Sequence, residues 1–244
     1  MIKAQRRFQV SGRSRSSCCA VGFSLIALLA LHSALAGGTQ DGSHAATPAP
    51  ALSPTITFTL DFPESIPDHY MVTVSADGRA AYDSTGKLTP EGDTPEPFHM
   101  EFVMSAGNRM KIFELARRAK YFAGKLDSEK HNLANTGVKT LTYQDGQRNT
   151  RASYNYSSSQ PVQELTSLFQ GISMTLEFGR RLEYFHRYQK LALDDELKRM
   201  DEMERSNALE EMQALAPILK KISEDQSVIN GARARALRLL QGSR

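Results

Sequence analysis

The sequence predicts an α+β protein in which an antiparallel sheet of hairpins is covered by helices and followed by an all-helical C-terminal region. Two observations carry this prediction. Between residues 54 and 158, several segments alternate apolar with polar residues, which is typical of half-buried strands, and Asp-Gly pairs stand between them. From residue 159 to residue 244, apolar residues recur at helical spacing instead.

The first 36 residues have the pattern of a cleavable signal peptide. The strongest part of the apolar run, residues 21–31, is about half the length that a membrane-spanning helix needs. Ala34 and Ala36 are small, so we expect cleavage between Ala36 and Gly37. No acidic residue and five cations precede the apolar run: Lys3, Arg6, Arg7, Arg13 and Arg15.

Two questions about export stay open at this point. Arg6 and Arg7 loosely resemble a twin-arginine signal, although a generally basic segment explains them as well, so both the general secretory route and the twin-arginine route remain. An uncleaved segment would leave the protein anchored in a membrane by its N terminus. The main prediction is a periplasmic or secreted protein with no integral membrane segment after cleavage.

Removing the signal peptide changes the composition. Five of the 30 Lys and Arg residues leave with it, so 25 remain against 27 Asp and Glu, and a positive chain becomes slightly acidic. This argues against nucleic acid as a partner. Cys18 and Cys19 are removed as well, which excludes a disulfide, a thiol nucleophile and a cysteine metal site in the mature protein.

The α+β region is expected to follow a flexible linker, residues 37–53, which is rich in small residues and proline. Residues 55–62 and 98–104 alternate as strands, and residues 108–123 have helical spacing ending at Gly124. Two hairpins are predicted, one over residues 70–82 through Asp77-Gly78 and one over residues 138–154 through Asp145-Gly146. For both we expect two-residue turns with positive φ.

The first of these hairpins resembles part of a known protein family. Its sequence, YMVTVSADGRAAY, is similar to the first hairpin of an uncharacterised family of secreted bacterial α+β domains, and the likeness is taken to extend over residues 54–158. Members tend to have a cysteine motif before the hairpin, whereas Asp68 and His69 stand there in this chain. The resemblance implies a fold and a compartment and implies no chemistry.

The helical region begins near Pro161 with a stripe of apolar residues. Acid-first i,i+4 pairs then follow over residues 194–205, which predicts a solvated helix. In an alternative interpretation, the apolar residues of this helix form a seam for a partner helix, which would give a homo-oligomer through residues 193–204. The stripe is Val162, Leu165, Phe169, Ile172 and Leu176, and the seam is Leu193, Leu197, Met200 and Met203.

The last forty residues predict a helical hairpin. Its first helix spans residues 209–222 with a kink near Pro217, and its second spans residues 228–240. Residues 208–241 resemble a single HEAT-type hairpin through Ala216-Pro217-Ile218-Leu219, Asp225-Gln226-Ser227-Val228 and the later Ala232, Ala236 and Leu240. That resemblance implies a scaffold associated with protein binding, although one unit does not make a solenoid.

The sequence offers little catalytic chemistry. It has no Gly-x-Ser-x-Gly motif, no phosphate-binding loop and no dinucleotide fingerprint. Asp61, Asp68 and His69 are the one grouping that suggests a metal or an acid–base pair, although an acidic loop that keeps a hairpin soluble explains them too. We expect no cofactor.

The sequence therefore favours a non-catalytic protein-interaction module of the cell envelope that binds a protein partner of unidentified nature. Tyr184, Phe185 and Tyr188 form the predicted contact patch together with the apolar seam, although at least one of these aromatic residues is expected in the core. The alternatives are an enzyme with dispersed residues near Asp61 and His69, and a structural homo-oligomer.

Overall fold

The computed structural model describes residues 53–63, 65–88, 92, 94–130 and 132–242. The predicted signal peptide, its cleavage site at Ala36 and all of the predicted linker except Ser53 lie outside the described residues. Within the described part, no helix is long and apolar enough to cross a membrane.

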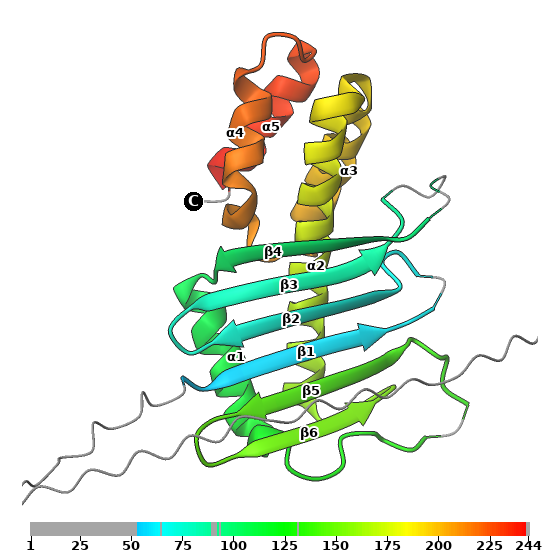
Figure 1. Ribbon diagram of the computed structural model, residues 1–244, viewed down its shortest axis with the longest axis vertical. Coiled ribbons are helices and arrows are strands. Elements are labelled where there is room, and N and C mark those ends of the chain that lie inside the picture. The colour runs from blue at the N-terminus through cyan, green and yellow to red at the C-terminus, as the bar shows by residue number, and fades with distance from the viewer. Residues whose placement is uncertain (1–52, 64, 89–91, 93, 131, 243–244) are drawn as a thin grey trace, which may run out of the picture. The chain divides into compact units, whose positions relative to one another are not determined.

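A six-stranded antiparallel sheet forms the first half of the described chain, in the order β4-β3-β2-β1-β5-β6 (Figure 1). The predicted alternation is clear in β1, where every second residue from Ile56 to Leu60 is buried, whereas β5 buries three residues in succession from Lys139 to Leu141. The α+β prediction is confirmed. The strands are β1 (Thr55–Asp61), β2 (His69–Ser75), β3 (Arg79–Gly86), β4 (Glu96–Val103), β5 (Val138–Gln144) and β6 (Asn149–Tyr154).

Both predicted hairpins form, but their turns are longer than two residues. Between β2 and β3, the last paired residues are Val74 and Ala80. Only Gly78 of the Asp77-Gly78 pair has a positive φ, +97°, and its amide donates a 2.9 Å hydrogen bond to the carbonyl of Ser75. One glycine in the left-handed region is enough to close such a longer turn.

The turn between β5 and β6 needs no positive φ at all. Its last paired residues are Gln144 and Asn149, and the carboxylate of Asp145 accepts hydrogen bonds from the amides of Gln147 and Arg148, at 2.8 and 2.6 Å. Gly146 has an ordinary backbone conformation. The aspartate therefore closes this turn with its side chain, not by adopting the left-handed conformation.

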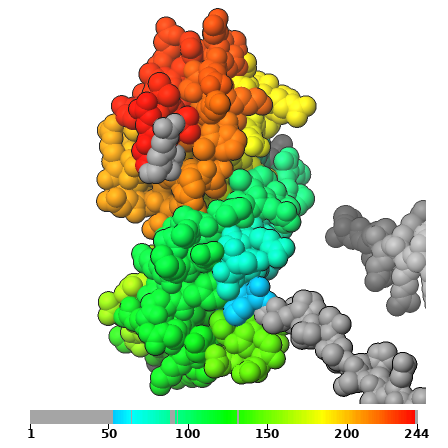
Figure 2. Space-filling view, turned by 90° about the vertical axis from the view of Figure 1, so that its left-hand side faces the viewer, coloured from blue at the N-terminus to red at the C-terminus, as the bar shows by residue number. Residues whose placement is uncertain are grey.

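Two helices cover one face of the sheet, and three stand beyond its β4 edge. In Figure 1, α1 and α2 lie behind the strands, and α2 continues past β4 to meet α3, α4 and α5. Figure 2 shows α4 and α5, in orange and red, above the strands and α1. The helices are α1 (Ala106–Arg118), η1 (Lys120–Phe122), α2 (Gln160–Tyr188), η2 (Lys190–Ala192), α3 (Leu193–Arg205), η3 (Met212–Leu215), α4 (Ala216–Glu224) and α5 (Asn230–Gly242).

Helix α1 differs from its prediction at both ends. It begins two residues earlier, because the hydroxyl of Ser105 accepts a hydrogen bond from the amide of Asn108 and so caps the helix. It ends at Arg118, where the chain turns through Tyr121 in the left-handed region. Phe122 is nevertheless buried, so the predicted apolar stripe is completed by the following turn.

The hydrophobic core lies between the sheet and α2 and extends into α1, α3, α4 and α5. All five residues of the predicted α2 stripe are fully buried, and the ring of Phe169 stacks on that of Phe58 in β1 with centroids 5.1 Å apart. Fully burying side chains of this size is worth about 1.5–3 kcal/mol each. The spacing of these residues predicted the buried stripe correctly, because α2 is a single unbroken helix.

The C-terminal hairpin forms, but its first helix is shorter than predicted. Leu209 lies between α3 and η3 and is not helical. η3 then makes one tight turn, and α4 starts at Ala216. Pro217 is in the first turn of α4, where its missing amide costs no hydrogen bond, and therefore it begins the helix and does not kink one.

The predicted seam of α3 is buried inside the chain. Leu193, Leu197 and Met200 are 0% exposed, and α3 packs against α2 and α5 of the same chain. The prediction that these residues form an exposed surface for another protein or a second copy is therefore corrected. Met203 is the seam residue that stays partly exposed.

The charged face of α3 is also less solvated than predicted. Glu196 and Asp201 are buried. Of the sequence's acid-first i,i+4 pairs, Asp201–Arg205 is formed, whereas Asp194–Lys198 and Asp195–Arg199 are not. Asp194 pairs with Arg235 of α5 instead, and Asp201 also meets Arg238 at 3.4 Å. Arg235 and Arg238 therefore join α5 to α3.

Candidate functional site

Among the cavities that α2 lines, two have Leu88 in their walls. We call the larger one the basic cleft; it has a volume of ≈ 920 Å³ and contains the predicted contact residues Tyr184 and Tyr188. We call the smaller one the apolar pocket; it has a volume of ≈ 560 Å³ and contains Met203. Both volumes are of the size that binding sites have.

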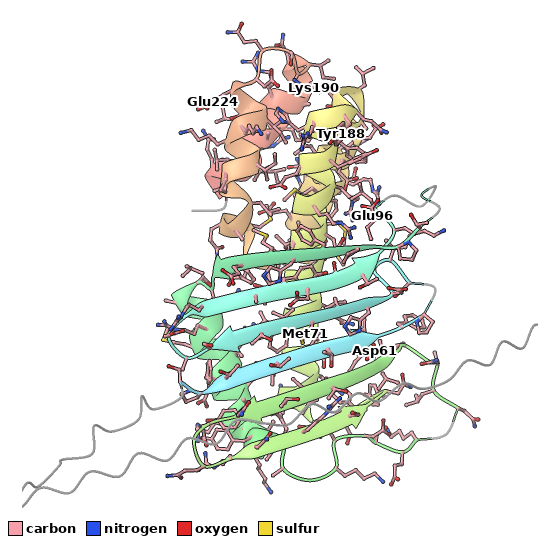
Figure 3. All side chains as sticks on the ribbon, in the orientation of Figure 1. Asp61, Met71, Glu96, Tyr188, Lys190 and Glu224 are labelled. Carbon is pink, nitrogen blue, oxygen red and sulfur yellow. The ribbon has the colours of Figure 1, made fainter. Side chains whose placement is uncertain are left out.

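The basic cleft is formed where the C-terminal half of α2 passes the start of β4 and meets α4. Figure 3 labels three of its residues: Tyr188 and Lys190 near the end of α2, and Glu96 below them at the start of β4. The other lining residues are Leu88, Pro97, Phe98, Arg180, Glu183, Tyr184, His186, Arg187, Pro217, Ile218 and Lys221.

Cations exceed carboxylates in the lining of the basic cleft. The lining contains four Lys and Arg side chains and two Glu side chains. Asp225, next to the cleft, offsets the charge of Lys190, because its Oδ2 lies 2.6 Å from Nζ of Lys190. Arg187 and Lys221 have no ion pair within the described part of the chain. The cleft thus presents free positive charge to an incoming ligand.

Arg180 is the buried cation of the basic cleft, with a side chain only 7% exposed. Its Nη2 donates a 3.1 Å hydrogen bond to the carbonyl of Glu96, and its guanidinium lies 5.4 Å from the ring centroid of Phe98. Its Nη1 has no hydrogen-bond partner among the described residues and lies 3.7 Å from Oε2 of Glu177. A buried charge needs such compensation to be stable.

The predicted aromatic patch divides between the surface and the core. Tyr184 and Tyr188 are one turn apart on α2, with ring centroids 5.2 Å apart, and Tyr188 is 61% exposed. The guanidinium of Arg187 lies 5.2 Å from the ring centroid of Tyr188. Phe185 is buried, as was expected for at least one member of the patch.

A charged cluster fixes the end of α2 to the turn between α4 and α5. Nε2 of His186 lies 2.9 Å from Oδ2 of Asp225, and Nζ of Lys190 donates to the same oxygen at 2.6 Å. The hydrogen bond from Lys190, followed by those from Ser227, holds the pKa of Asp225 well below its usual range. The wall of the cleft is therefore held by ionic contacts.

The apolar pocket lies between α2, the chain following β1 and α3. Apolar side chains make up most of its lining surface, and its polar lining residues are Ser65, Gln170, Ser173, Glu177, Arg181 and Arg199. Met203 and Arg199 belong to α3, while Ser173 and Glu177 belong to α2. The apolar wall residues include Phe62, Ile66, Leu88, Met174, Phe178 and Met203.

A buried group of hydrogen bonds lies beside the apolar pocket. Tyr82 and Ser84 of β3 donate to Oε1 of Glu177, at 2.9 and 2.6 Å, and the hydroxyls of Tyr82 and Ser173 are 2.9 Å apart. Burial, with the nearby charge of Glu177, raises the pKa of Tyr82 far above its usual range. Its hydroxyl therefore stays protonated and acts as a donor.

The sequence interpretation missed Glu177 and Arg180. The available signal was their spacing, because Ser173, Glu177 and Arg180 follow one another at helical intervals on the same side of α2 as Leu176. Polar residues on a buried helix face require partners from another element. The sequence does not say which element supplies them.

The predicted metal or acid–base grouping is only partly brought together. Nδ1 of His69 lies 2.5 Å from Oδ1 of Asp61 on the exposed face of the sheet, while Oδ1 of Asp68 is buried without a hydrogen-bond partner among the residues that the structure describes. A second pair on that face joins His99 and Asp83 at 2.7 Å, and the contact with Asp83 raises the pKa of His99. Within the described ranges, no group of three His, Cys, Asp or Glu residues is placed to hold a metal ion.

No protein family model matches this chain, and no curated protein matches it. The resemblances to a secreted α+β family and to a HEAT-type hairpin therefore stay predictions. The function has to be argued from the geometry of the two cavities.

Proposed function

We propose that this chain is an exported, non-catalytic interaction module of the cell envelope that binds an acidic segment of another protein in the basic cleft. The observation that carries the proposal is the exposed ring of Tyr188, 61% accessible, with the guanidinium of Arg187 beside it at the cleft. Tyrosine and arginine, together with tryptophan, are enriched among the residues that dominate the binding energy of protein interfaces.

The charge of the cleft supports an acidic partner. Arg187 and Lys221 lie in the lining of the same cavity and have no carboxylate of their own in the described part of the chain. Carboxylates of a partner would supply the missing counter-charges and would be attracted at long range before contact. Tyr184 and Tyr188 would then cover the apolar parts of the same segment.

The position of the rival acid–base pair argues for binding over catalysis. The rival acid–base pair, Asp61 and His69, lies on the exposed sheet face and is not part of either cavity lining. A general base has to reach its substrate inside a site that orients it.

Site-specific crosslinking in the intact envelope tests the proposal. A photo-crosslinking amino acid placed at Tyr188 is expected to give a discrete adduct with one protein. The same probe at Met110, a 65% exposed position on α1, is the matched control. Arg187→Glu and Lys221→Glu should each reduce the Tyr188 adduct, because like charges repel an acidic segment. Equal adducts at Met110, or no response to the charge reversals, would contradict the proposal.

Defined peptides test the chemistry of the partner. Fluorescent peptides containing Asp, Glu and Leu are compared with versions in which Asn and Gln replace the acids. The acidic peptides should bind more tightly, and their affinity should fall as salt is raised, since exposed charges are screened. Equal binding of the amide versions would contradict an acidic partner.

Export is tested separately by sequencing the N terminus of the protein from the envelope fraction. Cleavage after Ala36 would give a mature chain that begins at Gly37. A protein that retains residues 1–36 in a membrane fraction would support the anchored alternative.

A further inference from the structure

We infer that the apolar pocket is a second site, separate from the basic cleft, and that it binds an amphipathic anion with a single long acyl chain, of the fatty-acid type. This inference does not depend on the protein-binding function proposed above. It rests on the walls of the pocket and on the excess positive charge at its rim.

The walls fit a flexible apolar chain. Phe62 and Ile66 come from the segment between β1 and β2, Met174 and Phe178 from α2, and Met203 from α3. Methionine side chains adapt to irregular apolar shapes, which suits a chain of methylene groups. Ile66 is 46% exposed, and covering such surface with an apolar ligand is favourable.

The rim carries more positive than negative charge. Nε of Arg181 donates to Oε1 of Glu196 at 2.6 Å, and Nη1 of Arg199 donates to Oε2 of the same carboxylate at 3.3 Å. Among the described residues, two guanidinium groups thus share one carboxylate, which leaves one positive charge uncompensated there. Both arginines line the pocket, and Arg199 is 65% exposed, so its free donors can reach a ligand.

The carboxylate inside the pocket lining does not reverse this preference. Glu177 already receives hydrogen bonds from Tyr82 and Ser84, and Arg180 lies 3.7 Å from its other oxygen. Its negative charge is therefore compensated within the protein. An anionic head group at Arg199, with the chain among the apolar walls, satisfies both parts of the pocket.

Displacement of a fluorescent fatty acid tests the inference on the full protein. The probe is 11-(dansylamino)undecanoate, and the competitors are decanoate, decanol, decylamine and butyrate. Decanoate should displace the probe better than decanol or decylamine, and butyrate should fail because its chain is too short to cover the walls. Displacement by decanol as effective as that by decanoate, or the absence of probe binding, would overturn the inference.

Two variants locate the ligand. Arg199→Glu should weaken decanoate binding by roughly tenfold or more, since a charge-assisted hydrogen bond is lost and repulsion replaces it. Met203→Trp should block the chain, and Arg187→Glu in the basic cleft is the control that should leave binding unchanged. Because Arg199 is mostly exposed, its replacement is compatible with a normal fold, which circular dichroism checks. Unchanged affinity in a folded Arg199→Glu variant would overturn the assignment of the head group.

If the pocket instead takes an apolar side chain of a partner protein, the peptide experiments respond to Met203→Trp and decanoate does not bind.

Discussion

The hydroxyl of Tyr82 in β3 donates a 2.9 Å hydrogen bond to the carboxylate of Glu177 in α2, across 95 residues of chain. Ser84 donates to the same oxygen at 2.6 Å. Burying a carboxylate costs free energy unless hydrogen-bond donors surround it. These two hydroxyl groups offset that cost, so α2 can carry a buried glutamate that faces the sheet. They also join α2 to β3, and α2 contributes residues to the lining of both cavities.

Replacing Tyr82 by Phe should destabilise the protein by about 1–3 kcal/mol, because Glu177 would lose one of its buried donors while the ring is retained. Urea unfolding followed by circular dichroism measures the change. The matched control is Tyr188→Phe, which removes a hydroxyl from an exposed ring and should change the free energy of unfolding by less than about 0.5 kcal/mol. Equal effects of the two substitutions would mean that the buried hydrogen bond contributes nothing.

Asp225→Asn should make stability less dependent on pH in the acidic range. The pKa of Asp225 is lowered in the folded protein, mainly by Lys190, so its carboxylate stabilises the fold above the ordinary pKa of about 3.9. That contribution is lost as the pH falls below about 4 towards the lower folded value. The thermal midpoints of wild type and variant should therefore differ most near neutral pH and converge in acid.

The control for this pH dependence is Asp195→Asn on α3. Asp195 is exposed and has no ion pair in the described chain. Its replacement should leave a nearly constant difference from the wild type across the same pH range. A difference for Asp225→Asn that stays constant or grows on acidification would contradict the role given to its carboxylate.

Two glycines should respond differently to alanine. Gly137 has a φ of +85°, and a Cβ there would lie 2.6 Å from Cβ of Phe62, so Gly137→Ala should cost at least about 1 kcal/mol. Gly146 has an ordinary φ and no atom within 4 Å of an added Cβ, so Gly146→Ala should be neutral or slightly stabilising. Thermal unfolding of both variants checks the turn geometry, since a positive φ at Gly146 would make its replacement costly.

Leu197→Ala should destabilise each chain without changing its state of association. Leu197 is fully buried on α3, so truncation leaves a cavity and costs about 2–5 kcal/mol. Leu191→Ala, at an 81% exposed position, should cost little. Unfolding experiments combined with analytical ultracentrifugation give both readings. If Leu197→Ala instead dissociates an oligomer, the result would support the hypothesis that α3 forms a seam between two chains.

The candidate sites were only partly predictable. Tyr184 and Tyr188 were identified because large aromatic residues stand out at helical spacing in a charged segment. Arg180 and Arg199 were not identified. The local sequence around a helical arginine does not show whether its side chain faces water, a carboxylate or a cavity. The cavities arise only where α2 meets β4, α3 and α4, and no local pattern records those meetings.

The sequence by itself determined the strands, the two hairpins and the apolar stripe of α2. These depend on side-chain periodicity, which is a local property of the chain: alternation from Thr55 to Asp61 or helical spacing from Val162 to Leu176 needs no knowledge of the partner. Tertiary structure alone decided what each apolar or charged face meets. The periodicity of α3 predicted that Leu197 is buried against a helix, but only packing shows that α2 and α5 of the same chain cover it.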